Sequence, residues 1–386
     1  MKTVLLVSEL GGGFGHVRRL LPLAREAAAQ GFTPVFLVRN PREVQAVIGG
    51  EPFEVRTAPS IQGWVPALAS RTAIAHSFAD VLGNAGLSDA AMLRAALQAW
   101  DRTLADIRPK AIICEHSPLL CLAVWRRDVP TLVVGYGFVL PPPHLMRFPP
   151  LSDALPTHDE RLLLDNVRVV LAERGSVAPQ ALPALFAGHA HFVTGLDELD
   201  PYRSLRLQPA VGLPGAPPQL TALDGDEVFA YLLGDAPATH TLLAGLNRSG
   251  ARGRVYVRRG TAEQRHALAG GGMIWLEDPT DTRLALDRAR LVVHHGSMLM
   301  SEEALLAGRP QLVVPLYLEH LVTAHALEAL GVGKPLVASA RPEMVDAAIA
   351  QVQSDAGLGR AAQAFARAAQ PAPDPARLLD AVLADA

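Results

Sequence analysis

A glycine-rich segment near the start of the chain ends in a histidine. LLVSELGGGFGHVRRL (residues 5–20) places four glycines and His16 between an apolar run and a helical pattern. A histidine at the carboxyl edge of such a strand can take a proton from a substrate hydroxyl. Two other interpretations stay open. The segment is a tight turn whose histidine caps the helix, or it is a dinucleotide phosphate loop, although Val17 stands where that fingerprint has its third glycine.

A carboxylate is expected to support this histidine. Glu115 ends a second apolar run in AIICEHSP (111–118), so parallel strands would bring it to the same sheet edge. A carboxylate there would hold the histidine in one tautomer and stabilise its cation. The alternative is a surface acid that pairs with an arginine. His116 is the next residue on an extended segment and is expected to point the other way.

The second half of the chain contains a longer polar constellation, VVHHGSMLMSEEALLAGRPQLVVPLYLEHLVTAHAL (292–327). A strand pattern ends at His295, a glycine–serine turn follows, and a helix comes next. The start of a helix beside a glycine turn favours phosphate or diphosphate. Glu319 and His320 follow the next strand pattern, where they suit the hydroxyls of a sugar. A competing interpretation makes His294 and His295 a core residue and a helix cap.

Composition favours a cytoplasmic enzyme or binding protein. The 386 residues are 49% hydrophobic and 19% charged, and the net charge of −3 predicts no attraction to nucleic acid. Cys114 and Cys121 stand in an apolar stretch and give no sign of a disulfide framework or a metal site. The first apolar run is too short for a signal peptide and is soon followed by Glu9. No run is long enough to span a membrane.

The polar segments are set in an alternation of strands and helices. Apolar, β-branched runs in both halves are separated by helical patterns such as 89–107, which predicts parallel sheets covered on both faces. We therefore predict an α/β protein of two doubly wound, Rossmann-like domains that face a cleft. The predicted parts are an N-terminal domain (1–206), a linker (207–227), a C-terminal domain (228–370) and a final helix that packs back on the first domain (371–386).

Residues 290–326 resemble the donor-binding signature of nucleotide-sugar-dependent glycosyltransferases of the UDP-glycosyltransferase type, which have the GT-B fold. The segments that match are His295-Gly296, Glu303-Ala304-Leu305, Ala307-Gly308-Arg309-Pro310, Pro315 and Glu319-His320. GFGHVRR is similar to the family's amino-terminal Gly-His motif, and Glu115 stands where many members have a supporting Asp. FVTGLDELDPYR (192–203) resembles a segment that precedes the linker in bacterial members.

The resemblance implies an inverting transfer of a sugar from a UDP- or dTDP-sugar to a small-molecule acceptor, without a metal or a tightly bound cofactor. The first domain would bind the acceptor and the second the nucleotide sugar. His16 would be the base and Glu115 its support. Loops 56–88 and 139–160 would form the acceptor pocket. The donor diphosphate, ribose, sugar and base would be held by residues that comprise Gly13, Gly15, Trp275, Leu276, His295, Gly296, Ser297, Met298, Glu303, Glu319 and His320.

Four positions depart from the family pattern. Leu299-Met300 replace the usual Gly-Thr, which leaves Ser297 or Ser301 as the phosphate-binding hydroxyl, and His320 and Thr323 replace a Gln and an Asn. Two alternative functions remain. The first is a non-catalytic sugar-nucleotide-binding partner of another enzyme, and the second is a sugar-nucleotide epimerase of the same fold.

Overall fold

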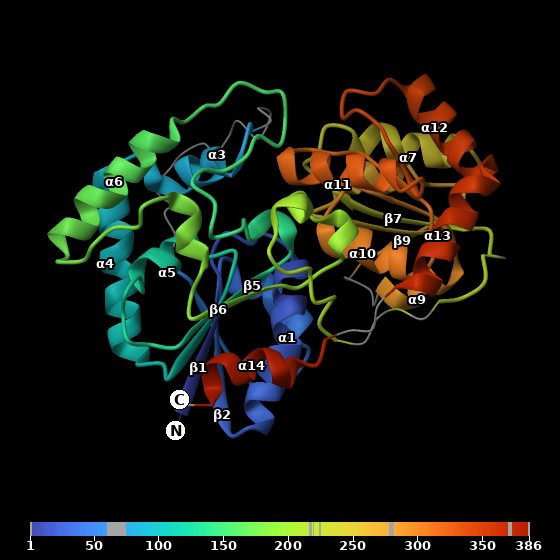
Figure 1. Cartoon of the computed structure of the whole chain (residues 1–386). Helices are drawn as coiled ribbons and strands as arrows, with labels where there is room; N and C mark the ends of the chain where they lie inside the picture. The colour runs from blue at the N-terminus through green and yellow to red at the C-terminus, as the bar shows by residue number, and fades with distance from the viewer. Residues whose placement is uncertain are drawn as a thin grey trace. The chain divides into compact units, whose positions relative to one another are not determined.

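The computed structural model describes residues 2–59, 75–215, 218, 220–223, 225–277, 282–369 and 373–384. The chain divides into two compact units, Met1–Gly215 with Ala372–Ala386, and Ala216–Pro371. Each unit is an α/β body built on its own six-stranded parallel sheet (Figure 1). The predicted class of two doubly wound α/β domains is confirmed.

The sheet of the first unit has the strand order β3-β2-β1-β4-β5-β6. The chain first adds strands on one side of β1 and then crosses over to β4, so the switch point of the sheet lies between β1 and β4. Ser8, the last residue of β1, is the register partner of Glu115, the last residue of β4. The strands are β1 (Lys2–Ser8), β2 (Phe32–Val38), β3 (Glu54–Thr57), β4 (Ala111–Glu115), β5 (Thr131–Gly135) and β6 (Ala190–Val193).

Helices cover this sheet because its strands are apolar on both faces. Alternate side chains of β1, such as Val4 and Leu6, pack with Val17 and Leu20 of α1 and with Leu379 of α14 in one buried cluster. Figure 1 shows α14 beside α1, although the whole chain separates the two helices in sequence. The helices are α1 (Phe14–Ala29), α2 (Pro41–Ile48), α3 (Phe78–Leu82), α4 (Ala90–Ile107), α5 (Pro118–Ala123), α6 (Glu160–Glu173) and α14 (Pro375–Leu383).

The second unit repeats this topology in the order β12-β11-β10-β7-β8-β9. Its switch point therefore lies between β7 and β10, and one face of the sheet packs against α7 and α12. The strands are β7 (Glu227–Leu233), β8 (Arg252–Arg258), β9 (Gly272–Leu276), β10 (Ala289–His294), β11 (Gln311–Val313) and β12 (Gly333–Pro335). The helices are α7 (Thr239–Arg248), α8 (Ala262–His266), α9 (Thr282–Arg288), α10 (Met298–Leu306), α11 (Leu318–Ala329), α12 (Pro342–Ser354) and α13 (Ala356–Ala368).

The boundary between the two units lies inside the predicted linker, directly after Gly215. Its described residues 220–223 are fixed to the second unit by two buried side chains. Arg309 donates from Nη1 to the carbonyl of Ala222 (2.9 Å), and Gln363 donates from Nε2 to the carbonyl of Thr221 (3.0 Å). Residues 216, 217, 219 and 224 of the linker, and 60–74 of the predicted acceptor loop 56–88, lie outside the described residues.

Candidate active site and nucleotide site

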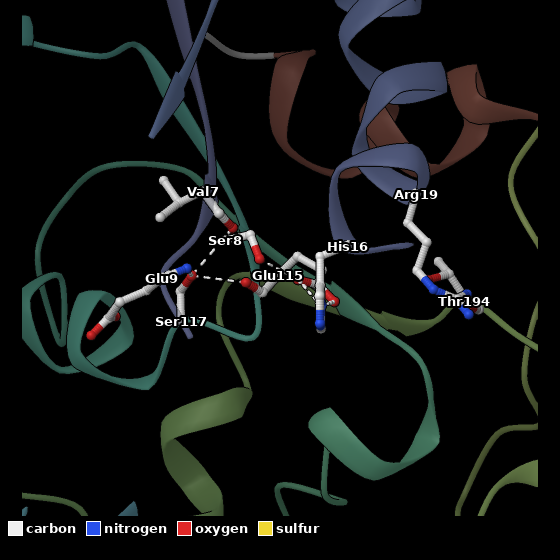
Figure 2. A network of polar contacts seen from close by, with 8 residues as sticks. All are labelled: Val7, Ser8, Glu9, His16, Arg19, Glu115, Ser117 and Thr194. Atoms are coloured by element: carbon white, nitrogen blue, oxygen red, sulfur yellow. Dashed lines mark hydrogen bonds and ion pairs between the residues drawn. The ribbon is translucent and has the colours of Figure 1, made fainter. Parts of the chain in front are cut away.

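The switch point of the first sheet holds a histidine–carboxylate pair (Figure 2). His16 lies in the first turn of α1, and its Nδ1 is 2.8 Å from Oε1 and 3.0 Å from Oε2 of Glu115. A carboxylate can only accept, so Nδ1–H donates and the lone pair of the neutral ring is on Nε2. The side chain of Glu115 is fully buried, whereas that of His16 is 15% exposed. The second nitrogen of His16, Nε2, is therefore not the one that binds Glu115.

Glu115 stays ionised in spite of its burial. Ser8 donates from Oγ to Oε2 of Glu115 (2.8 Å), in addition to the bond from His16. Burial raises the pKa of Glu115, but the charge and hydrogen bond of His16 and the hydroxyl of Ser8 outweigh it, so the pKa is lowered. An ionised Glu115 fixes the tautomer of His16 and would stabilise its protonated form.

The glycine loop lies directly against this pair. A Cβ built on Gly11 would lie 2.2 Å from Oγ of Ser8 and 2.6 Å from Cγ of His16, so a larger residue would displace one of them. Gly13 is the extended N-cap of α1, and Gly15 lies in its first turn. Both were predicted to bind the donor, but they belong to the first unit, whereas the other donor candidates belong to the second.

The prediction that His116 points away from this site is wrong. Strand β4 ends at Glu115, and His116 has a left-handed backbone with φ of 44°, so the alternation of a strand no longer applies. Its ring stacks on that of His16, with centroids 5.5 Å apart. Burial lowers the pKa of His116 to about 3, and the charge of His16 adds to this effect. His116 is therefore a neutral neighbour of His16.

Two further neighbours of His16 were not predicted. The ring of Tyr136 lies 5.9 Å from that of His16, and the guanidinium of Arg19 lies over Tyr136 at 4.9 Å. Arg19 is buried and donates to the carbonyl of Thr194 beyond β6 (Figure 2). An arginine three residues after His16, on the apolar side of the helix, is a sequence signal that could have identified it.

The switch point of the second sheet holds His295, directly after β10. Nδ1 of His295 donates to the carbonyl of Val314 (3.0 Å), which leaves Nε2 as the acceptor of the neutral ring. Nε2 lies 3.5 Å from Oγ1 of Thr239, the first residue of α7, whose hydroxyl donates to the carbonyl of Leu233 (2.6 Å). Burial lowers the pKa of His295 to about 4. Nε2 and the start of α7 are thus together at this edge.

His294 has a structural role, as one of the two competing interpretations expected. Its Nε2–H donates to Oε1 of Gln311 (2.8 Å), and its Nδ1 accepts from the backbone of Gly296 (3.0 Å). Burial lowers its pKa to about 4. Both nitrogens of the neutral ring are used, so His294 fixes the turn that precedes α10.

The turn after His295 requires glycine. Gly296 has φ of 91°, and a Cβ on it would lie 2.9 Å from the carbonyl oxygen of His320. Ser297 is the N-cap of α10 without a side-chain cap bond, and Met298 begins the helix. Glu303 lies in the same helix and is 5% exposed.

Glu319 and His320 lie in the first turn of α11, at the end of the strand next to β10. His320 is 2% exposed, and neither ring nitrogen has a hydrogen-bond partner among the described residues. Its ring lies against that of Tyr317, with centroids 3.8 Å apart and the two planes tilted by 31°. Burial holds the pKa of His320 well below its usual value, so its ring is neutral. Gly296 brings the backbone of this turn close to His295.

Trp275 and Leu276 end β9, at the far side of the same sheet. Trp275 is half-buried, with the guanidinium of Arg265 5.5 Å from its ring. A Cβ on Gly260 would lie 2.6 Å from the Trp275 ring, so this glycine leaves room for the indole. The indole therefore has a fixed place at the carboxyl edge.

Two kinds of feature are absent from the part of the chain that the structure describes. No three His, Cys, Asp or Glu side chains there are grouped to hold a metal ion. None of the described helices has the length and apolar character to cross a bilayer.

Comparison with known proteins places the chain among glycosyltransferase folds. Residues 280–384 match the family described as erythromycin biosynthesis protein CIII-like, C-terminal domain. None of the curated proteins matches the chain significantly by sequence. The predicted resemblance to GT-B glycosyltransferases is confirmed by this match and by the solved structures that follow.

Three similar structures cover nearly the whole chain. The calicheamicin glycosyltransferase CalG4 is 20% identical with a TM-score of 0.68, over 100% of this chain and 98% of the other. The spinosyn rhamnosyltransferase SpnG complexed with thymidine diphosphate is 18% identical with a TM-score of 0.66, over 98% and 99%. The glycosyltransferase SnogD from Streptomyces nogalater is 17% identical with a TM-score of 0.65, over 100% and 99%. The predicted GT-B fold is thus confirmed.

Proposed function

We propose that this chain, which has the GT-B fold, is an inverting glycosyltransferase that transfers a sugar from a nucleoside-diphosphate sugar to a small-molecule acceptor. The observation that carries the proposal is the bond from His16 to Glu115 at the switch point of the first sheet. A base held in one tautomer by a buried carboxylate is the arrangement needed to deprotonate a hydroxyl.

In the proposed reaction, Nε2 of His16 takes the proton of the acceptor hydroxyl. The acceptor oxygen forms a bond to the anomeric carbon, and the bond from this carbon to the diphosphate breaks on the opposite side. The electron pair of that bond leaves with the diphosphate, and the anomeric configuration inverts. Glu115 stabilises the imidazolium form of His16 throughout this step.

The second unit is the proposed donor site. His295, the turn at Gly296–Ser297 and the start of α10 at Met298 would face the diphosphate, because backbone N–H groups at a helix start favour an anion. An anion near Nε2 of His295 would raise its pKa from about 4 and favour the form that donates from this nitrogen. Glu303 remains the proposed ribose ligand, Glu319 and His320 the proposed sugar ligands, and Trp275 with Leu276 the proposed contact of the base.

The donor that we propose first is a dTDP-sugar, because a structurally similar glycosyltransferase was solved with thymidine diphosphate. The acceptor that we propose is an aglycone, the class of molecule complexed with the same enzyme in another structure. The sequence left the choice between UDP and dTDP open.

A binding experiment tests the nucleotide class. The melting temperature is measured with dTDP, UDP, GDP and thymidine at equal concentrations. Ligand at about 100 times its Kd stabilises the fold by about 2.7 kcal/mol, so a nucleotide that binds is readily seen. We expect dTDP to raise the melting temperature most and thymidine least. No shift with any of the nucleotides would contradict both the transferase and the sugar-nucleotide-binding alternative.

A further inference from the structure

A second glutamate, Glu9, lies beside the His16–Glu115 pair and has no part in the chemistry proposed above. Glu9 directly follows Ser8, the last residue of β1, whose hydroxyl donates to Glu115. Figure 2 shows the Glu9 side chain directed away from His16. The residue is completely buried.

Glu9 joins the loop after β1 to the loop after β4. Its backbone N–H donates to Oγ of Ser117 (3.0 Å), and its Oε2 accepts from the backbone N–H of Leu120 in the first turn of α5 (3.2 Å). Ser117 also donates from Oγ to the carbonyl of Glu115 (2.8 Å). The backbone that carries Glu115 is thereby tied to the backbone that leads into the glycine loop.

The surroundings of Glu9 do not compensate a full negative charge. Its Oε1 is buried without a hydrogen-bond partner among the described residues. Burial raises the pKa of Glu9 to about 8, although the backbone N–H groups of Leu120 and Leu119 oppose the rise. Among the described residues, the buried thiol of Cys114 on β4 interacts electrostatically with Glu9, and it is hydrogen-bonded to the buried thiol of Cys121 on α5. Neither thiol supplies a positive charge.

We propose that Glu9 is a positioning residue for the His16–Glu115 pair, which it holds in place as an uncharged carboxylic acid that bridges the loops after β1 and β4. This inference rests on the proposed function for the role of the pair itself. In the uncharged state the carbonyl oxygen of Glu9 accepts from α5, and no buried charge is left unpaired. Ionisation would leave an uncompensated buried charge in the residue next to Ser8, which is bonded to Glu115.

Two variants separate shape from charge. Glu9→Gln keeps the size of the side chain and an oxygen that accepts from Leu120, but it cannot ionise. Glu9→Ala removes the bridge altogether. Glu26→Gln is the matched control, because Glu26 bonds to Gln30 on the exposed side of α1.

The first readout is stability against pH and needs no activity. A carboxyl whose pKa rises on folding stabilises the fold fully below its unfolded pKa and loses this contribution as the pH rises through the folded pKa. For Glu9 that window runs from the ordinary value of 4.5 to about 8. As the pH rises across this window, we expect the melting temperature of Glu9→Gln to increase relative to that of the wild type. For the control Glu26→Gln we expect this difference in melting temperature to stay constant with pH. A constant difference for Glu9→Gln would contradict the proposal that Glu9 is uncharged.

The second readout is the titration of His16 and the rate of donor hydrolysis, which both report on the His16–Glu115 pair. In NMR spectra of histidine-labelled protein, Glu9→Ala should shift the apparent pKa of His16, and Glu9→Gln should restore the wild-type value. Donor hydrolysis should fall about 100-fold in Glu9→Ala, since a small misplacement of a base has an effect of this size. An unchanged His16 titration in Glu9→Ala would overturn the positioning role. Absence of hydrolysis in the wild type would instead count against the proposed function and leave the NMR result intact.

Discussion

Nδ1 of His16 donates a hydrogen bond of 2.8 Å to a buried carboxylate oxygen of Glu115, across 99 positions of sequence. The two residues meet where the chain reverses the direction in which it adds strands to the first sheet. In open α/β sheets this is the place where ligands bind. The pair is therefore chemically suited to proton transfer and lies at the edge of the sheet where ligands of such folds bind.

Removal of the Glu115 charge should reduce catalysis more than binding. In Glu115→Gln, His16 loses the carboxylate that fixes its tautomer and stabilises its cation, and we expect turnover to fall about 100-fold or more. Ser8→Ala removes one hydrogen bond to Glu115 but leaves its charge and its bond to His16, so it should reduce turnover less than Glu115→Gln does. Steady-state rates of donor hydrolysis, with the Kd for dTDP measured in parallel, check this order. A larger effect of Ser8→Ala than of Glu115→Gln would contradict it.

The glycine loop offers a test in which the adjacent residue, Gly12, serves as the control for Gly11. Gly11→Ala would place a methyl group against Ser8 and His16, whereas a Cβ on Gly12 meets only Nη1 of Arg39 at 3.5 Å. We expect Gly11→Ala to lower activity about 100-fold by displacing the base, and Gly12→Ala to behave like the wild type. Equal activities of the two variants would show that the loop does not constrain His16.

His295 should act on the diphosphate and not on the nucleoside. A hydrogen bond to a charged group contributes about 1.5–3 kcal/mol, so His295→Ala should weaken dTDP binding about 10- to 100-fold. Binding of thymidine, which lacks phosphate, should not change. Isothermal titration calorimetry of both ligands checks the prediction. An equal loss for dTDP and thymidine would indicate a general disturbance of the site.

The turn at Gly296 should be essential for the stability of the second unit. Gly296→Ala combines a positive φ with a contact of 2.9 Å to the backbone of His320, whereas Gly250 has φ of 66° and open space around it. Gly250→Ala should cost about 1–2 kcal/mol of unfolding free energy, from backbone strain alone. Gly296→Ala should cost clearly more, as measured by denaturant titration. Equal losses of unfolding free energy in the two variants would mean that the backbone of His320 can move away from a Cβ at position 296 without a loss of stability.

The sequence predicted the central strands because they are apolar over their whole length, as in TVLLV and RLVVHHG. It missed β3 and β12, two edge strands that are short and carry polar residues such as Glu54 and Lys334. The edge strands β6 and β9 were predicted from HFVTG and MIWL, so β3 and β12 were missed because they are short and lack an apolar run.

The site was predictable where its residues follow central strands. Glu115 and His295 were found because parallel strands deliver their carboxyl ends to one edge. His116 was misplaced because a single left-handed residue after β4 turns its ring back toward His16. The bridge formed by Glu9 was not seen because it depends on which backbone N–H of α5 lies over the carboxyl group, and this is set by tertiary packing.

Hydrolysis of a dTDP-sugar by the wild type and by His16→Ala tests the central claim most directly, since water then replaces the unknown acceptor. The account predicts a rate at least about 100-fold lower in His16→Ala, the effect of losing a general base, with the Kd for dTDP unchanged. Equal rates of hydrolysis with equal binding would contradict the claim that His16 is the base.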